Sequence, residues 1–149
     1  VDDDTLINVE RIRFTDTNIA LDLDNHAGQT AKILGAVLGK EALNDKKYVG
    51  IGLHFLDSGV SYEELMDLAL KAVLGDDAND HLSVIKLLYK NILHVDASDS
   101  DTDELVELLD NGMSRGEFGV MAADTSFNAE NIDLIDLRET GLAYALYEG

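Results

Sequence analysis

The chain has 149 residues, 46% of them hydrophobic, which is enough for one domain with a buried core. Thirty acidic residues against eleven basic ones give a net charge of −19, which argues against nucleic acid and anionic membrane surfaces as partners. The absence of cysteine excludes disulfides and thiolate metal sites, and no apolar run of about 18 residues predicts a membrane span.

The N-terminal segment, residues 1–24, is predicted to form a β-hairpin. Ile12 and Phe14 alternate with polar neighbours, and Ile19 and Leu21 do the same after a polar turn. A lone hairpin is marginal in water. We therefore expect its apolar face to pack on the rest of the chain or to continue a larger sheet.

Residues 27–76 are predicted to form three amphipathic helices. The first follows Asp24 or Asn25 as N-cap and closes at Gly39, the second runs from about Asp45 to Asp57, and the third begins at Ser61 and ends at Gly75. Ser61 with Glu64 three residues later predicts a capping box at the start of the third helix.

The pattern restarts in residues 80–127. A fourth helix carries an apolar stripe from Ile85 to Leu93, the acidic stretch from Asp96 to Glu104 is predicted to be its exit loop, and a short fifth helix holds Leu105 to Leu109. Ser114 with Glu117 predicts the capping box of a sixth helix. A last helical stretch is predicted over residues 128–147, with Gly141 as its weakest point.

These two segments repeat each other. Leu56-Asp57-Ser58-Gly59-Val60-Ser61 returns as Leu109-Asp110-Asn111-Gly112-Met113-Ser114 at an offset of 53. Ile33 to Gly39 aligns with Leu88 to His94 at an offset of 55. The sequence thus predicts a mainly α fold: the hairpin, then two tandem three-helix units and a C-terminal helix packed as one helical domain over residues 25–149.

The chain also resembles a known bacterial family. The run Leu87-Leu88-Tyr89-Lys90-Asn91-Ile92-Leu93, with Leu108-Leu109-Asp110-Asn111-Gly112-Met113-Ser114 after an Asp-rich segment, resembles a helical domain of unknown function. Such domains are common in exoproteins of type I secretion, beside calcium-binding glycine-rich (RTX) repeats, and are similar to phycobilisome linkers and S-layer anchoring regions. Residues 4–29 look like the hairpin that joins RTX repeats to these units.

This resemblance implies a secreted or cell-surface location and flanking RTX repeats in the same chain. The family has no established activity to carry over. Its usual LGR-x-PD motif is replaced here by Leu93-His94-Val95-Asp96, and the aromatic pair of its second helix by Leu53-His54 and Val106-Glu107. Any family role of the loop arginine or of exposed aromatic residues is therefore not expected in this chain.

Calcium is the one metal for which the sequence offers candidate ligands. Oxygen ligands at nearly alternate positions can wrap a hard cation, and this spacing occurs at Asp96, Asp99, Asp101, Asp103 and Glu104. The other interpretation is a solvated loop with a helix cap. The four histidines, His26, His54, His81 and His94, are scattered and do not predict a zinc site.

Aromatic residues and glycines give further structural predictions. Tyr48, Phe55, Tyr62, Tyr89 and Phe118 have helical core spacing and are predicted to pack inside, whereas Tyr144 and Tyr147 are candidates for exposure. Gly35 and Gly52 cost helix stability, so we expect each to allow the close approach of another element.

No catalytic motif stands out, so the function hypothesis rests on architecture. We expect a non-enzymatic structural or interaction module of a secreted or surface protein, for adhesion or anchoring to cell-surface polysaccharide or protein. One alternative is a calcium-responsive structural domain of an RTX-type exoprotein. The other is a polysaccharide-acting hydrolase with a pair of carboxylates.

Overall fold

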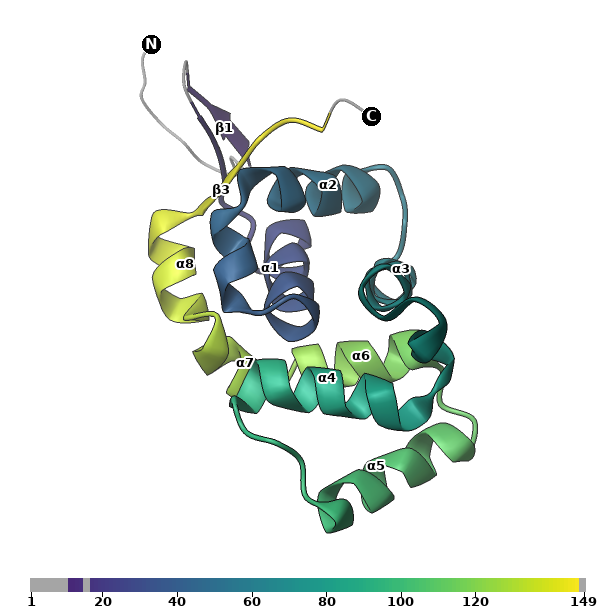
Figure 1. The fold of residues 1–149 in the computed structure, drawn as a ribbon. Coiled ribbons are helices and arrows are strands. Elements are labelled where there is room, and N and C mark those ends of the chain that lie inside the picture. The colour runs from purple at the N-terminus through teal and green to yellow at the C-terminus, as the bar shows by residue number, and fades with distance from the viewer. Residues whose placement is uncertain (1–10, 15–16, 148–149) are drawn as a thin grey trace.

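The fold is mainly α, as predicted. A computed structural model describes residues 11–14 and 17–147, and within them eight α-helices, two short 3-10 helices and one three-stranded antiparallel sheet are present. The sheet lies at one end of the helical body, next to α1 and α2, and α5 lies at the opposite end (Figure 1).

The elements follow one another in this order: β1 Arg11–Arg13, β2 Asn18–Ala20, α1 His26–Val37, η1 Lys40–Asn44, α2 Lys46–Asp57, α3 Tyr62–Leu74, η2 Gly75–Asn79, α4 His81–Leu93, α5 Asp99–Asp110, α6 Arg115–Ala123, α7 Ser126–Asn131, α8 Leu134–Thr140 and β3 Leu142–Tyr144.

The two three-helix units are confirmed by the helix starts. α4 starts 55 residues after α1, and α5 and α6 start 53 residues after α2 and α3. Both units turn in the same way after their second helix, because Gly59 and Gly112 have φ of 106° and 112° and close matching Schellman motifs. The capping boxes of Ser61 and Ser114 then start α3 and α6.

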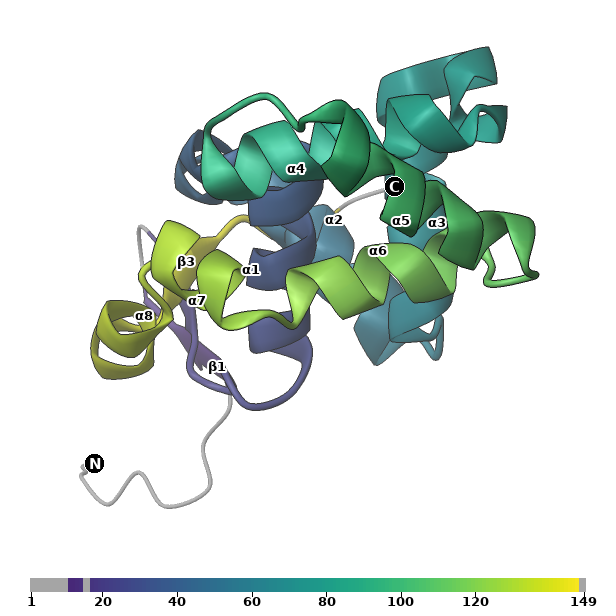
Figure 2. The same ribbon diagram turned by 90° about the horizontal axis from the view of Figure 1, so that it is seen from below.

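The two units are related by an approximate two-fold rotation. Asn91, the equivalent of Ala36, donates from Nδ2 to the Ala36 carbonyl at 3.0 Å. Gly116 is the equivalent of Glu63, and a Cβ at Gly116 would lie 2.6 Å from the Glu63 carbonyl oxygen. Contacts between equivalent positions are typical of a two-fold interface. The axis therefore passes where α1 meets α4 and where α3 meets α6, and in Figure 2 α6 runs from the side of α3 to the side of α1.

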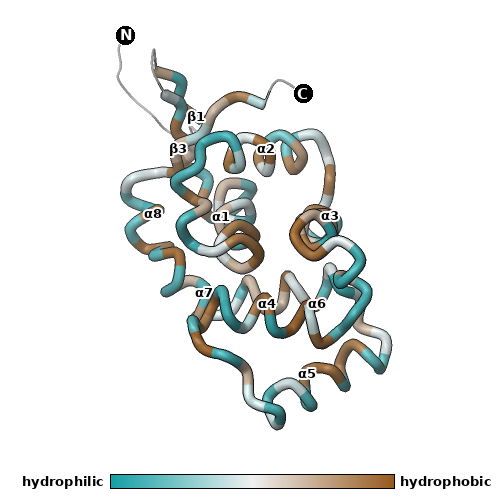
Figure 3. Tube along the Cα trace, viewed as in Figure 1, coloured by the Kyte–Doolittle hydropathy of each residue, from teal (hydrophilic) through white to brown (hydrophobic). Residues whose placement is uncertain are grey.

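One hydrophobic core joins the two units. Buried side chains from α1 to α6 form it: Ile33, Ala36, Val37, Leu56, Leu65, Met66, Leu70, Val84, Ile85, Leu88, Ile92, Leu109, Phe118 and Ala123. A second cluster lies under the sheet and includes Val49, Leu134, Leu142 and Tyr144. Hydrophobic colour is accordingly strong on α3 and α4 (Figure 3). Burial of this shared apolar surface holds the units together.

The hairpin prediction is confirmed where residues are described, with β1 paired antiparallel to β2. Residues 1–10 and 15–16 lie outside the described part of the chain. The strands are shorter than predicted, because β2 ends at Ala20. The larger sheet is completed by the chain itself, since β3 pairs antiparallel with β2 and Ile19 faces Ala143.

The prediction of one helical stretch over residues 128–147 is wrong. Two short helices, α7 and α8, are followed by strand β3. Gly141 ends α8 with φ of 79°, a conformation that glycine adopts readily. Leu142 and Tyr144 then alternate as buried residues of β3, which fixes the strand to the second core cluster.

The predicted exit loop from Asp96 to Glu104 is also wrong in part, because α5 begins at Asp99. Ser98 caps the helix and forms a capping box with Asp101. Asp99 and Asp101 lie in the first turn, where the positive end of the helix dipole stabilises carboxylates. The acidic composition that suggested a loop is thus a helix start.

The described residues contain no helix with both the length and the apolar character that crossing a membrane requires.

The glycine predictions are confirmed and those for aromatic residues only in part. A Cβ at Gly35 would lie 2.2 Å from Ile132, and one at Gly52 would lie 2.6 Å from Thr30. Tyr147 is exposed as predicted, but Tyr144 is buried under the sheet and Tyr48 is 47% exposed.

Candidate functional site: two equivalent apolar grooves

The first groove lies among the three helices of the first unit. We call it groove 1; its volume is about 470 Å³ and its lining is almost entirely apolar. Its walls come from α1, from α2 and from α3, and consist of Thr30, Ile33, Leu34, Leu38, Tyr48, Ile51, Gly52, Phe55, Leu65, Leu68, Ala69, Ala72 and Val73. An apolar wall of this kind favours apolar groups as ligands.

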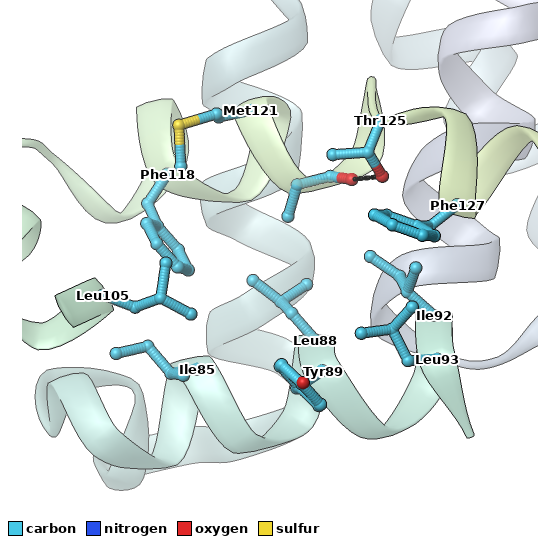
Figure 4. Close-up of a pocket in the computed structure, with 11 residues that line it drawn as sticks. Ile85, Leu88, Tyr89, Ile92, Leu93, Leu105, Phe118, Met121, Thr125 and Phe127 are labelled. Atoms are coloured by element: carbon cyan, nitrogen blue, oxygen red, sulfur yellow. Dashed lines mark hydrogen bonds between the residues drawn. The ribbon is translucent and has the colours of Figure 1, made fainter. Parts of the chain in front are cut away.

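The second groove, groove 2, lies among the helices of the second unit and is about 250 Å³ in volume. Its walls are Ile85, Leu88, Tyr89, Ile92, Leu93, Leu105, Phe118, Met121, Ala122, Thr125 and Phe127. In Figure 4, Leu105 and Phe118 converge near Ile85 at one end, and Phe127 lies beside Ile92 at the other. The Thr125 hydroxyl has a hydrogen-bond partner within the protein, because it donates to the Ala122 carbonyl at 2.8 Å.

Groove 2 is the counterpart of groove 1 under the internal repeat. At the offsets of 55 and 53, nine of its eleven lining positions fall on lining positions of groove 1. The nine pairs are Thr30 with Ile85, Ile33 with Leu88, Leu34 with Tyr89, Leu38 with Leu93, Gly52 with Leu105, Leu65 with Phe118, Leu68 with Met121, Ala69 with Ala122 and Ala72 with Thr125. Both copies therefore carry the same hollow.

Both grooves are open to solvent at large apolar side chains. Leu68 is 48% exposed in groove 1, and its equivalent Met121 is 41% exposed in groove 2. Phe127 adds a ring that is 58% exposed. Exposed apolar side chains are ordinary when scattered, but a group that lines one hollow marks an interaction site.

One polar group in groove 1 lacks a partner. Thr30 is buried, and its Oγ1 forms no hydrogen bond. In groove 2 the equivalent position is Ile85, which brings no polar atom into the wall. The cost of an unpaired hydroxyl thus falls on groove 1 alone.

The polar groups around the grooves serve packing. Tyr89 at the wall of groove 2 donates from its hydroxyl to Asp101 Oδ2 at 3.1 Å, and this bond raises the pKa of Tyr89. Between α3 and α6, burial beside the Asp124 carboxylate raises the pKa of Tyr62 far above its ordinary value. The Tyr62 hydroxyl donates to Asp124 at 2.9 Å, which ties the start of α3 to the end of α6.

The structure separates the five predicted calcium ligands. Asp99 and Asp103 line a hollow between the start of α4 and α5, together with Asp80 and Asp110. Asp101 is turned to Ser98 and Tyr89, and Asp96 pairs with Lys90 at 3.4 Å. Glu104 follows next to Leu105 on α5.

In the hollow between the start of α4 and α5, Asp80 and Asp110 make contacts that stabilise the fold. Asp80 caps α4 through Ser83, which lowers the pKa of Asp80, and Asp110 pairs with His81 at 2.9 Å. Among the described residues, no group of three or more histidine or acidic side chains is gathered closely enough to hold a metal ion.

A repeated contact between a histidine and an aspartate is not apparent from the motifs alone. His26 at the start of α1 lies 2.7 Å from Asp57 at the end of α2, and His81 lies 2.9 Å from Asp110 in the second unit. Both residues of each pair are related by the repeat offsets. The pairs join the first and second helix of each unit, and alignment of the two copies could have revealed them.

Comparison of this chain with family models, with curated proteins and with solved structures found no match. The resemblance to an RTX-associated helical family therefore stays a prediction from the motifs.

Proposed function

We propose that this chain is a non-enzymatic interaction module of a secreted or cell-surface bacterial protein and that it anchors a partner protein through its apolar grooves. The single observation that carries this proposal is the pair of equivalent grooves, whose walls are apolar in both copies of the unit. An amphipathic helix that lays its apolar face into a hydrophobic groove is a recurring mode of protein recognition.

A protein partner fits the grooves better than a polysaccharide does. A sugar chain needs many hydrogen-bonding groups around it, whereas the groove walls offer chiefly alkyl and aromatic side chains. The secreted or surface location is supported by the net charge of −19 and by the motif resemblance described above.

The experiment is selection of helical peptides from a display library, followed by affinity measurements on three variants. Leu68→Glu and Met121→Glu place a carboxylate at equivalent, half-exposed positions of the two grooves. We expect each selected peptide to lose at least about tenfold in affinity on one of these two variants, because a charge cannot be buried against an apolar face without a large cost.

The matched control is Ile135→Glu on α8, where the side chain is 74% exposed and lines neither groove. This variant should bind the peptides as the unchanged chain does, and circular dichroism should show that all three variants keep their helices. Failure to select any peptide, or peptides that bind both groove variants with full affinity, would exclude the proposal.

A further inference from the structure

The two grooves differ in the wall that the second helix of each unit provides. In groove 1, α2 contributes Tyr48, Ile51 and Phe55. At the offset of 53 the equivalent residues of α5 are Asp101, Glu104 and Leu108, so two apolar positions have become carboxylates. Groove 2 is thus an apolar hollow bordered by acidic residues at two positions where groove 1 has Tyr48 and Ile51.

The charge of α5 extends this border. α5 carries six acidic residues and no basic one, whereas α2 begins with Lys46 and Lys47. Glu104 is exposed, and only Thr102 and Leu109 of the helix are buried. α5 packs mainly on α4 and stands at the edge of the molecule (Figure 1). Asp99, Asp103 and Asp110 line the hollow on the other side of α5, and Asp101 is hydrogen-bonded to Ser98 and Tyr89. Glu104 is therefore the exposed carboxylate at the position that Ile51 occupies in groove 1.

We propose, on the basis of the function proposed above, that groove 2 binds an amphipathic helix of a partner protein that is basic along one flank. The apolar face of that helix contacts Phe118, Met121 and Phe127, and its lysine or arginine side chains lie over Glu104. Charges of opposite sign across an interface select the partner and fix its orientation, while the apolar contacts supply affinity.

The test uses two synthetic amphipathic peptides, one of leucine and lysine and one with glutamate in place of every lysine. The methyl signal of Met121 reports on groove 2, because Met121 lines it. The other two methionines do not line this groove: Met66 is fully buried, and Met113 lies in the turn before α6. In methyl NMR, we expect the lysine peptide to shift the Met121 signal and the glutamate peptide to leave it unchanged.

Charge reversal at two neighbouring residues distinguishes the effect of the acidic border on peptide affinity from the effect of the overall net charge. Glu104→Lys and Asp103→Lys change the net charge equally, but Asp103 lines the hollow on the other side of α5. Adjacent positions on a helix point about 100° apart around its axis, and Asp103 lies on the side of α5 that faces this other hollow. We expect Glu104→Lys to weaken the lysine peptide about threefold to tenfold and Asp103→Lys to weaken it by less than about twofold.

The outcomes distinguish this inference from the proposed function. Equal Met121 shifts with both peptides would overturn the basic partner and leave groove docking intact. Binding of the lysine peptide without a Met121 shift, or equal weakening by both variants, would show general attraction to an acidic surface and would also overturn the inference. If neither peptide binds, the inference is overturned, and the display selection alone decides the proposed function.

Discussion

The ion pair of Arg115 with Asp67 shows how a single residue connects the two units. Arg115, the first residue of α6, donates from Nε to Asp67 Oδ1 of α3 at 2.6 Å and from a terminal nitrogen to the Ala78 carbonyl at 2.7 Å. Lys71 lies 3.1 Å from the same carboxylate. The hydrogen bond from Arg115 is the main reason why the pKa of Asp67 lies below its ordinary value of 3.8.

This pair makes the cost of Asp67→Asn depend on pH. Because the pKa is lower in the folded state, the carboxylate stabilises the fold above about pH 4, and this contribution is lost as the pH falls through the folded pKa. We expect the variant to be less stable than the unchanged chain by about 1 kcal/mol at pH 7 and by much less near pH 2. Urea unfolding at both pH values measures the difference.

Glu107→Gln on α5 is the matched control, since Glu107 is exposed, lies beyond the first turn of its helix, and its loss should have little effect at either pH. A constant difference between Asp67→Asn and the unchanged chain at both pH values would contradict the assignment of the lowered pKa to Asp67.

At the scale of elements, the crossing of α3 and α6 depends on the absence of side chains. Gly116 meets the backbone of Glu63, and Gly119 meets Met66, where a Cβ would lie 2.4 Å from Met66 Cγ. Each glycine faces its own equivalent in the other unit. At this crossing the first unit therefore provides the larger residues, and the second unit provides the glycines that leave room for them.

Substitution at this crossing should be strongly asymmetric. Gly116→Ala forces the helices apart, because the obstructing atom is a backbone oxygen, and we expect a loss of about 2 kcal/mol in the free energy of unfolding. Glu63→Ala, at the equivalent exposed position of α3, should change stability by less than about 0.5 kcal/mol. Denaturant unfolding of both variants checks this; equal effects would contradict the packing argument.

The elements with clear periodicity and caps could be predicted from the sequence. The boundaries of α2 and α3 are close to those predicted, because Asp45, Ser61 and Gly75 are local signals that act within one turn. The predicted fifth helix is shorter than α5, because a run of acidic residues suggests a loop. At the start of a helix, however, the positive end of the helix dipole stabilises such residues. β3 was missed because its partner, β2, lies far away in sequence.

Helical periodicity alone could not predict the two grooves. Helical spacing indicates which residues face inward, but not whether the facing helices fill the space between them. Tyr48 has the spacing of a core residue and lies instead at the open wall of groove 1. The repeat did contain the relevant signal, since apolar residues recur at equivalent positions of both copies.

For the whole molecule, the net charge of −19 is the dominant electrostatic feature. Like charges repel within a compact fold, and this repulsion weakens the folded state relative to the expanded chain. The effect is concentrated where acidic residues lack basic neighbours, as in α5, which carries no lysine or arginine. Screening by salt therefore acts on the stability of the entire domain.

We expect the melting temperature to rise with salt. Between about 0.01 M and about 1 M NaCl the Debye length falls from about 30 Å to about 3 Å. Relief of about 1 kcal/mol of repulsion corresponds to a rise of about 2–4 °C for a chain of this size, which calorimetry can measure. A melting temperature that falls with salt would mean that ion pairs such as Asp67 with Arg115 outweigh the repulsion.

Calcium chloride and magnesium chloride at equal concentration extend this test, because the two salts screen charges alike. An additional rise of the melting temperature with calcium alone would support the calcium-responsive alternative.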